Sequence, residues 1–67
     1  MERRYLSIKE CAEYTGISEN TLYHWSREGK IPVFKVSNLL RFDKVKIDDW
    51  IREFERKSIN ADLLQTN

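Results

Sequence analysis

The stretch GISENTLYHWSREGKIP, residues 16–32, decides how this chain folds. Ser18 is a typical helix N-cap, and Gly29 followed by Pro32 is a typical helix end, so a helix is predicted over about residues 19–28. Its apolar residues are few and its polar residues are varied, which is unlike a helix enclosed in a core. One narrow face therefore packs inward, and the opposite face has the residue types of a binding surface.

The two faces of this helix follow from its spacing. Leu22, Trp25 and Ser26 form the inward face. The outward face offers hydrogen-bond donors, acceptors and a cation, and consists of Asn20, His24 and Arg27, flanked by Thr21 and Tyr23. The two Trp residues of the chain could stack on bases, but their helical spacing favours packing in the core.

A shorter helix precedes this one. Ser7 and Glu10 match a capping box, so a helix is predicted to begin near Ile8 and to end at Gly16. Its inward face consists of Ile8, Cys11, Ala12 and Thr15. Only a tight turn fits between the two helices, so they must cross, as in a helix-turn-helix.

A hairpin is predicted after the second helix. The β-prone runs VFKV and LLRF flank Ser37 and Asn38, and Asn38 is expected to take the positive φ of the turn. A two-stranded ribbon is marginal alone, so it must lean on the helices. Leu39 is expected to pack on the next helix; the alternative is an exposed side chain that touches a neighbouring protein or a groove.

A third helix is predicted after the hairpin, with Asp43 as its N-cap. The apolar stripe that should cover the core consists of Ile47, Trp50, Ile51 and Phe54. One domain is therefore expected over residues 1–56, followed by a polar and flexible tail over residues 57–67. Leu63 and Leu64 could instead dock on a partner or extend the last helix.

Composition limits the possible functions. A chain of 67 residues with 40% apolar content is one small domain, too small to enclose a reaction, so an enzyme is not expected. The net charge of +1 favours no partner. The charged residues within positions 26–42 are mostly basic, however, and those within positions 43–55 are mostly acidic. Cys11 is the single cysteine, so no internal disulfide forms and we expect a buried thiol. Neither a leader nor a membrane segment is recognisable, so a soluble, intracellular protein is expected.

Two crossed helices with a polar outer face on the second predict double-stranded DNA as the partner. Asn20, His24 and Arg27 are long enough to reach base edges. The side chains suited to phosphates are Ser18, Thr21, Tyr23, Lys30, Lys35 and Arg41. The alternative is an ordinary solvated helix face, and composition favours neither.

Other chemistry has little support in the sequence. His24 is the only histidine and has no cysteine or carboxylate at ligand spacing, so neither a metal nor a cofactor is expected. Asp48 and Asp49 are adjacent on a helix and point about 100° apart, so they do not form a catalytic pair. No small-molecule substrate and no membrane contact are expected.

The segment from Tyr5 to Ile51 resembles the small winged helix-turn-helix domain of the excisionase family, and residues 16–32 are similar to the opening of MerR-type regulators. The most specific matches to the family pattern are Gly16, Ile17, Ser18, Thr21, Leu22, Gly29, Ile31 and Pro32, followed by Arg41, Phe42 and the helix with Trp50. The resemblance implies an α+β, mostly helical fold with two short helices, a two-stranded hairpin wing and a third helix.

The resemblance also implies how such a domain acts. The second helix would lie in the major groove and the wing along the adjacent backbone or minor groove. Family members bend DNA and steer an integrase, or act as small transcriptional regulators of mobile elements, so an integrase or neighbouring copies would be further partners. A cytoplasmic protein of bacterial or phage origin is implied. Ser37, Asn38 and Leu39 replace the usual glycine and basic residues of the wing tip. That departure, with the acidic third helix and the tail, leaves a protein-interaction module as the rival function.

Overall fold

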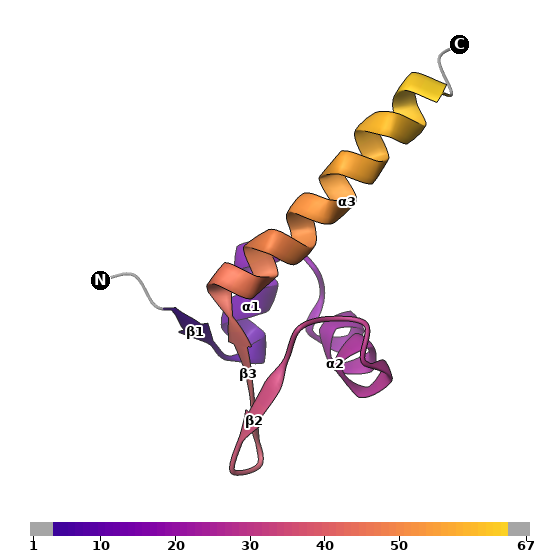
Figure 1. The fold of residues 1–67 in the computed structure, drawn as a ribbon. Coiled ribbons are helices and arrows are strands. Elements are labelled where there is room, and N and C mark those ends of the chain that lie inside the picture. The colour runs from indigo at the N-terminus through magenta and orange to yellow at the C-terminus, as the bar shows by residue number, and fades with distance from the viewer. Residues whose placement is uncertain (1–3, 65–67) are drawn as a thin grey trace.

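A computed structural model describes the backbone of residues 4–64 and the side chains of residues 4–57. The fold is α+β and mostly helical, with a small antiparallel sheet, as predicted (Figure 1). In chain order the elements are β1 (Tyr5–Leu6), α1 (Ile8–Thr15), α2 (Glu19–Glu28), β2 (Phe34–Val36), β3 (Leu39–Asp43) and α3 (Lys44–Leu64).

The ends of the first two helices form as predicted. The Ser7 side chain accepts a hydrogen bond from the Glu10 backbone at 3.2 Å, and the Glu10 carboxylate accepts one from the Ser7 backbone at 2.9 Å, which completes the capping box. Ser18 caps α2. Gly16 at φ 79° and Gly29 at φ 70° are the left-handed C-caps of α1 and α2. Gly16 and Ser18 together fix the tight turn between the two helices.

The sheet has a third strand that sequence analysis did not predict. Its strand order is β1-β3-β2, with Tyr5 opposite Asp43 and Leu6 opposite Phe42. The Lys44 N–H donates to the carbonyl oxygen of residue 4 at 2.7 Å. A strand of two residues is too short to show an alternating pattern, so only its partner in β3 defines it. The hairpin wing is thereby held in the sheet rather than resting on helices alone.

The hairpin turn differs from the prediction in one residue. Ser37 has the positive φ, at 59°, and Asn38 does not. Positive φ at the first central residue alone is the pattern of a type II′ turn, whereas the expected role of Asn38 belongs to the second central position. A hairpin with a two-residue turn forms in either case, so the strand register follows the predicted pattern.

The core lies where α1, α2, β3 and the start of α3 meet. Its buried apolar side chains are Leu6, Cys11, Leu22, Ile31, Phe42 and Ile47. Trp25 and Trp50 are half-buried and pack against this core, with ring centroids 5.9 Å apart. The Trp50 indole N–H also donates to the Lys30 carbonyl at 3.1 Å, which ties the end of α2 to α3. The prediction that both Trp residues pack inward is confirmed.

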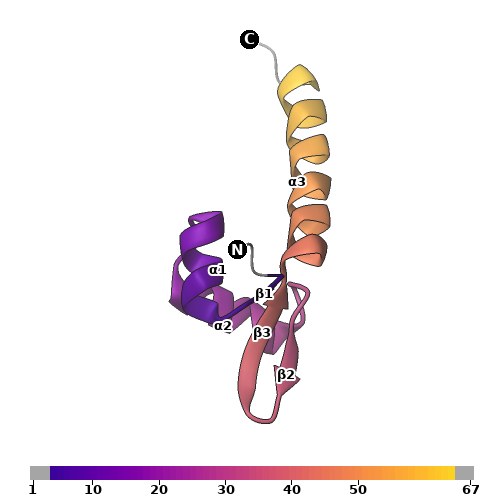
Figure 2. The same ribbon diagram turned by 90° about the vertical axis from the view of Figure 1, so that its left-hand side faces the viewer.

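The third helix differs from the prediction in two respects, the burial of Phe54 and the position of its C-terminal end. Asp43 caps it by accepting from the Val45 N–H at 3.0 Å, and Ile47 is fully buried, as predicted. Phe54 is 53% exposed, however, so the stripe covers the core only as far as Ile51. The backbone does not leave the helix near residue 57: α3 continues to Leu64, which is the alternative of an extended last helix. Residues 65–67 of the expected tail lie outside the described residues. In Figures 1 and 2, α3 projects away from α2 and the hairpin.

Candidate nucleic-acid interface

The outward face of α2 lies where the sequence placed it. Asn20, His24 and Arg27 are all exposed, while Leu22 on the opposite side of the helix is fully buried. Burial of the narrow apolar face fixes the rotation of α2 about its own axis. The three candidates for base contacts therefore form one accessible stripe.

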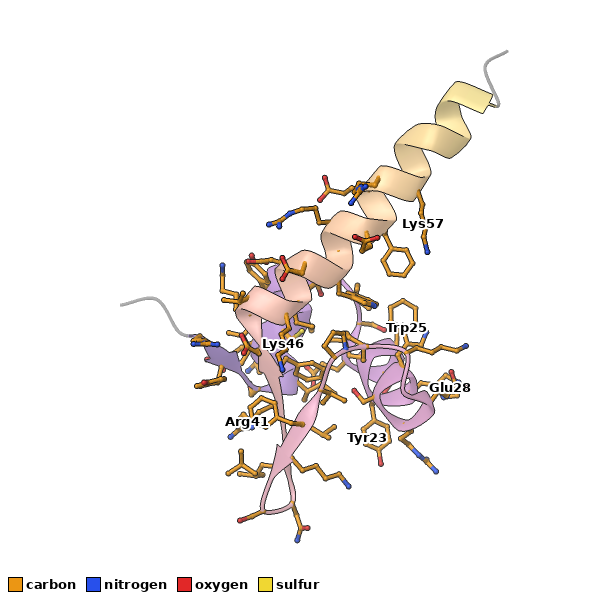
Figure 3. The ribbon with its side chains drawn as sticks, viewed as in Figure 1. Tyr23, Trp25, Glu28, Arg41, Lys46 and Lys57 are labelled. Atoms are coloured by element: carbon orange, nitrogen blue, oxygen red, sulfur yellow. The ribbon has the colours of Figure 1, made fainter. Side chains whose placement is uncertain are left out.

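An open cleft of about 650 Å³ separates α2 from the hairpin. It is lined by Tyr23, Ser26, Arg27, Lys35, Asn38 and Leu40. The Arg27 guanidinium lies 5.9 Å from the centre of the Tyr23 ring, and Tyr23 projects from α2 toward the side of the hairpin (Figure 3). Three predicted contact residues from two elements therefore meet here: Tyr23, Arg27 and Lys35.

Arg41 does not join this group. Opposed strand residues share a face of the sheet: Lys35 lies opposite Leu40, and Arg41 lies opposite Phe34 on the other face. Arg41 also donates to the Leu40 carbonyl oxygen at 2.8 Å. In Figure 3 it points away from α2. Lys35 and Arg41 thus lie on opposite faces of the hairpin.

The outer face of the hairpin, on the Arg41 side, is apolar and hollowed. A depression of about 360 Å³ is lined by Tyr5, Phe34, Val36, Leu39 and Arg41. Leu39 is 56% exposed, so the expectation that it packs on the third helix is wrong. Leu40, its neighbour in β3, is the residue that turns toward the core.

The remaining phosphate candidates of α2 are already engaged within the protein. The Ser18 hydroxyl accepts from the Thr21 N–H at 3.2 Å and donates to the Thr21 hydroxyl at 2.9 Å. Both residues stand at the N-terminus of α2, where free N–H groups and the helix dipole favour an anion. Their hydroxyls therefore shape that end of the helix as its cap.

At the other end of α2, the Glu28 carboxylate contacts two of the residues predicted to bind DNA, His24 and Lys30. One carboxylate oxygen lies 3.1 Å from His24 Nε2, and the other lies 3.1 Å from Lys30 Nζ. The hydrogen bond from Lys30 is the main cause that lowers the pKa of Glu28, and the nearby His24 adds to it. The expectation that no carboxylate stands at ligand spacing from His24 is wrong, since Glu28 follows it by four residues and contacts it. Spacing of i, i+4 from His24 was the available signal.

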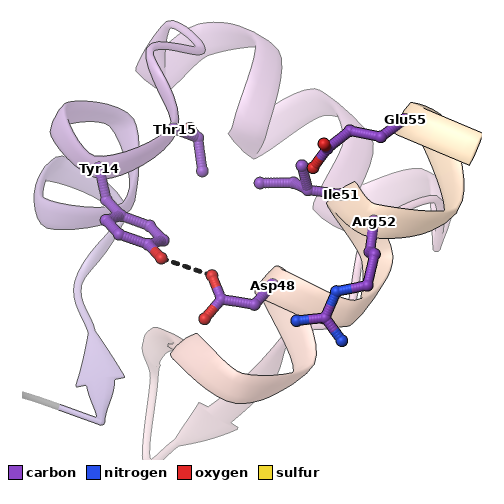
Figure 4. Close-up of a pocket in the computed structure, with 6 residues that line it drawn as sticks. All are labelled: Tyr14, Thr15, Asp48, Ile51, Arg52 and Glu55. Atoms are coloured by element: carbon purple, nitrogen blue, oxygen red, sulfur yellow. Dashed lines mark hydrogen bonds between the residues drawn. The ribbon is translucent and has the colours of Figure 1, made fainter. Parts of the chain in front are cut away.

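Another hollow, of about 440 Å³, lies between α1 and α3 and is lined by Tyr14, Thr15, Asp48, Ile51, Arg52 and Glu55 (Figure 4). The Tyr14 hydroxyl donates to Asp48, and this bond is the main cause that lowers the pKa of Asp48. Lys44 Nζ lies 3.3 Å from Asp48 and 4.7 Å from the centre of the Tyr14 ring. Asp49 pairs separately with Arg52 at 3.0 Å. Asp48 and Asp49 therefore do not converge, as predicted, and Asp48 fastens α1 to α3.

Two negative findings apply to the part of the chain that the structure describes. Among those residues, no group of three or more His, Cys, Asp or Glu side chains is placed to hold a metal ion. Within the same range, no helix has both the length and the apolar character needed to cross a membrane.

A helix pair with an exposed polar second helix, a hairpin beside it and cations in the cleft between them define a small helix-turn-helix DNA-binding domain. The model of the helix-turn-helix domain family matches residues 5–55, and the chain belongs to this family. In the comparisons with curated proteins and with solved structures, nothing matches the chain.

Proposed function

We propose that this domain binds double-stranded DNA in a sequence-specific manner, with α2 in the major groove and the hairpin beside the adjacent backbone. Asn20, His24 and Arg27 would contact base edges. The proposed phosphate contacts are Ser18, Thr21, Tyr23, Lys30 and Lys35, with Arg41 available on the outer side of the hairpin.

The observation that carries this proposal is the cleft between α2 and the hairpin. A stripe on one helix could be an ordinary solvated face. Here Arg27 and Tyr23 from α2 share an open cleft with Lys35 from β2, so two elements present cations and polar groups in one direction. A duplex in the major-groove geometry offers base edges and flanking phosphates side by side, which suits such a pair of elements.

The test compares Arg27→Ala with Lys35→Ala on a preferred site, selected from random oligonucleotides, and on a scrambled site at two or more salt concentrations. If Arg27 binds a guanine through two hydrogen bonds, Arg27→Ala costs about 1–3 kcal/mol on the preferred site and relaxes the choice at one base. Lys35→Ala should weaken both sites equally and reduce the salt slope by about 1.

Lys57→Ala is the matched control, because Lys57 is an exposed cation on α3 and belongs to neither α2 nor the hairpin (Figure 3). It should leave the salt slope unchanged. Equal loss on both sites in Arg27→Ala would make Arg27 a phosphate contact and leave base recognition to Asn20 and His24. Unchanged binding in both Arg27→Ala and Lys35→Ala would refute an interface at this cleft.

The biological role that we propose is that of an excisionase-like architectural factor or a small transcriptional regulator of a mobile element, in the cytoplasm of a bacterium. The support is the resemblance of residues 5–51 to excisionases. An architectural factor would bend its site and bind neighbouring repeats cooperatively, with an integrase as a further partner. Circularly permuted fragments carrying one or two sites would measure both properties in a mobility-shift assay. Straight DNA and independent binding would favour the regulator.

A second candidate function is a protein-interaction module on the same fold. The observation that favours it is the apolar outer face of the hairpin, where Phe34, Val36 and Leu39 are exposed. Each phosphate contact adds about 0.9 to the slope of log K against log salt. If the affinity for DNA showed no dependence on salt concentration, the protein would make no phosphate contacts, and this second function would be favoured over the first.

A further inference from the structure

Glu28 lies between two nitrogen-bearing side chains, those of His24 and Lys30, at the end of α2. Its two carboxylate oxygens are divided between His24 Nε2 and Lys30 Nζ, each at 3.1 Å. The side chains of His24 and Lys30 are 70% and 64% exposed, and that of Glu28 is 38% exposed. Both nitrogen groups are therefore accessible to an external anion, although each already contacts the Glu28 carboxylate.

The carboxylate makes the contacts that a DNA phosphate would make. A phosphate also presents anionic oxygens that accept hydrogen bonds from lysine and imidazole N–H groups. The Glu28 carboxylate is ionised at neutral pH, since its ordinary pKa is 4.5 and the Lys30 hydrogen bond lowers this pKa further. A phosphate that approaches Lys30 must therefore displace this carboxylate and also approach its negative charge.

We infer that Glu28 competes with DNA phosphates for Lys30, and that it thereby suppresses binding to DNA of unrelated sequence. This inference rests on the proposed DNA-binding function. Binding to unrelated sequences depends on phosphate contacts almost alone, so the competition weakens it most. Binding to the preferred site also gains base contacts from Asn20 and Arg27, which Glu28 does not hold. Glu28 is therefore a specificity-determining residue that acts through its neighbours.

The test is Glu28→Gln, which keeps the length of the side chain and removes its charge. Glu19→Gln is the matched control, because Glu19 is an exposed acid in the first turn of the same helix and its loss changes the net charge equally. Fluorescence anisotropy titrations on the preferred and the scrambled site, at several salt concentrations, give the affinities and the salt slopes. Thermal melts of both variants verify that they are folded.

Glu28→Gln should bind the scrambled site more tightly than the parent, with a salt slope steeper by about 1, since one phosphate contact is released. The ratio of affinities for the preferred and scrambled sites should fall. Adding Lys30→Ala to Glu28→Gln should remove the extra slope. Glu19→Gln should leave the slope and the ratio unchanged.

Three outcomes would overturn the inference. The first is a Glu28→Gln variant with the parent's slope and ratio, and the second is equal changes in Glu28→Gln and Glu19→Gln. The third is weaker binding to the preferred site alone, because Glu28 would then contact a base, such as the cytosine amino group. In all three the parent protein still binds DNA. A parent protein without salt-dependent binding would instead refute the proposed function itself.

Discussion

Replacing Phe42 with alanine should remove much of the stability of this domain. Phe42 is 0% exposed and lies in β3, the central strand, opposite Leu6. Removing a buried phenylalanine ring costs about 3–5 kcal/mol, because both the burial and the packing around the ring are lost. A domain of 67 residues has a free energy of unfolding of about 3–10 kcal/mol in total. The melting temperature should therefore fall by more than about 12 °C, at about 4–8 °C per kcal/mol.

Phe54→Ala is the matched control for this prediction. Phe54 is 53% exposed and meets Trp50 edge to face at 5.0 Å, so its loss should cost about 0.5–1.5 kcal/mol. Circular dichroism melts and urea titrations measure both variants. If Phe42→Ala does not fold, Phe42→Leu keeps the comparison possible, with a loss between the two. Equal losses in Phe42→Ala and Phe54→Ala would show that the core does not lie around β3.

Three further predictions concern single groups. The hydrogen bond from Arg4 is the main cause that lowers the pKa of Asp43, so its stabilising effect is present above the ordinary value of 3.8 and is lost as the pH falls through the lowered value. Melts from about pH 5 to pH 2 should show a shallower fall for Asp43→Asn than for the parent. Burial raises the pKa of Cys11 to about 11, so a thiol reagent at neutral pH should label it only after denaturation. Ser37→Gly should raise stability by up to about 1 kcal/mol, since Ser37 has φ 59°, whereas Asn38→Gly should give no gain in the same melts.

The features of the fold that could be predicted from the sequence are those with local causes. The capping box of Ser7 and Glu10 and the glycine at each helix end act within a few residues, and the structure has them all. The strand β1 could not be predicted, because its two residues pair with a strand far along the chain. The length of α3 was underestimated because polar residues near position 57 weaken the apolar period without ending a helix.

The candidate site was predictable as a helix face and not as a surface made by two elements. The apolar spacing of α2 placed Asn20 and Arg27 correctly on the outside. Which cation of the hairpin faces α2 depends on the strand register, and this separates Lys35 from Arg41. The i, i+4 spacing could have indicated the contact of Glu28 with His24. Its contact with Lys30 depends on side-chain geometry beyond the end of the helix, which composition and periodicity do not describe.

The short strand β1 also has a consequence for the order of folding. The helix pair and the hairpin form between neighbours along the chain, whereas Arg4 and Asp43 are separated by 39 residues. Closing so long a loop is entropically costly and gains a contact only when β3 already exists, so we expect β1 to dock late. Until it does, the Lys44 N–H at the start of α3 lacks its partner in residue 4. The Lys44 amide proton should therefore become protected from hydrogen exchange only when β1 has paired with β3, and its protection would report that step.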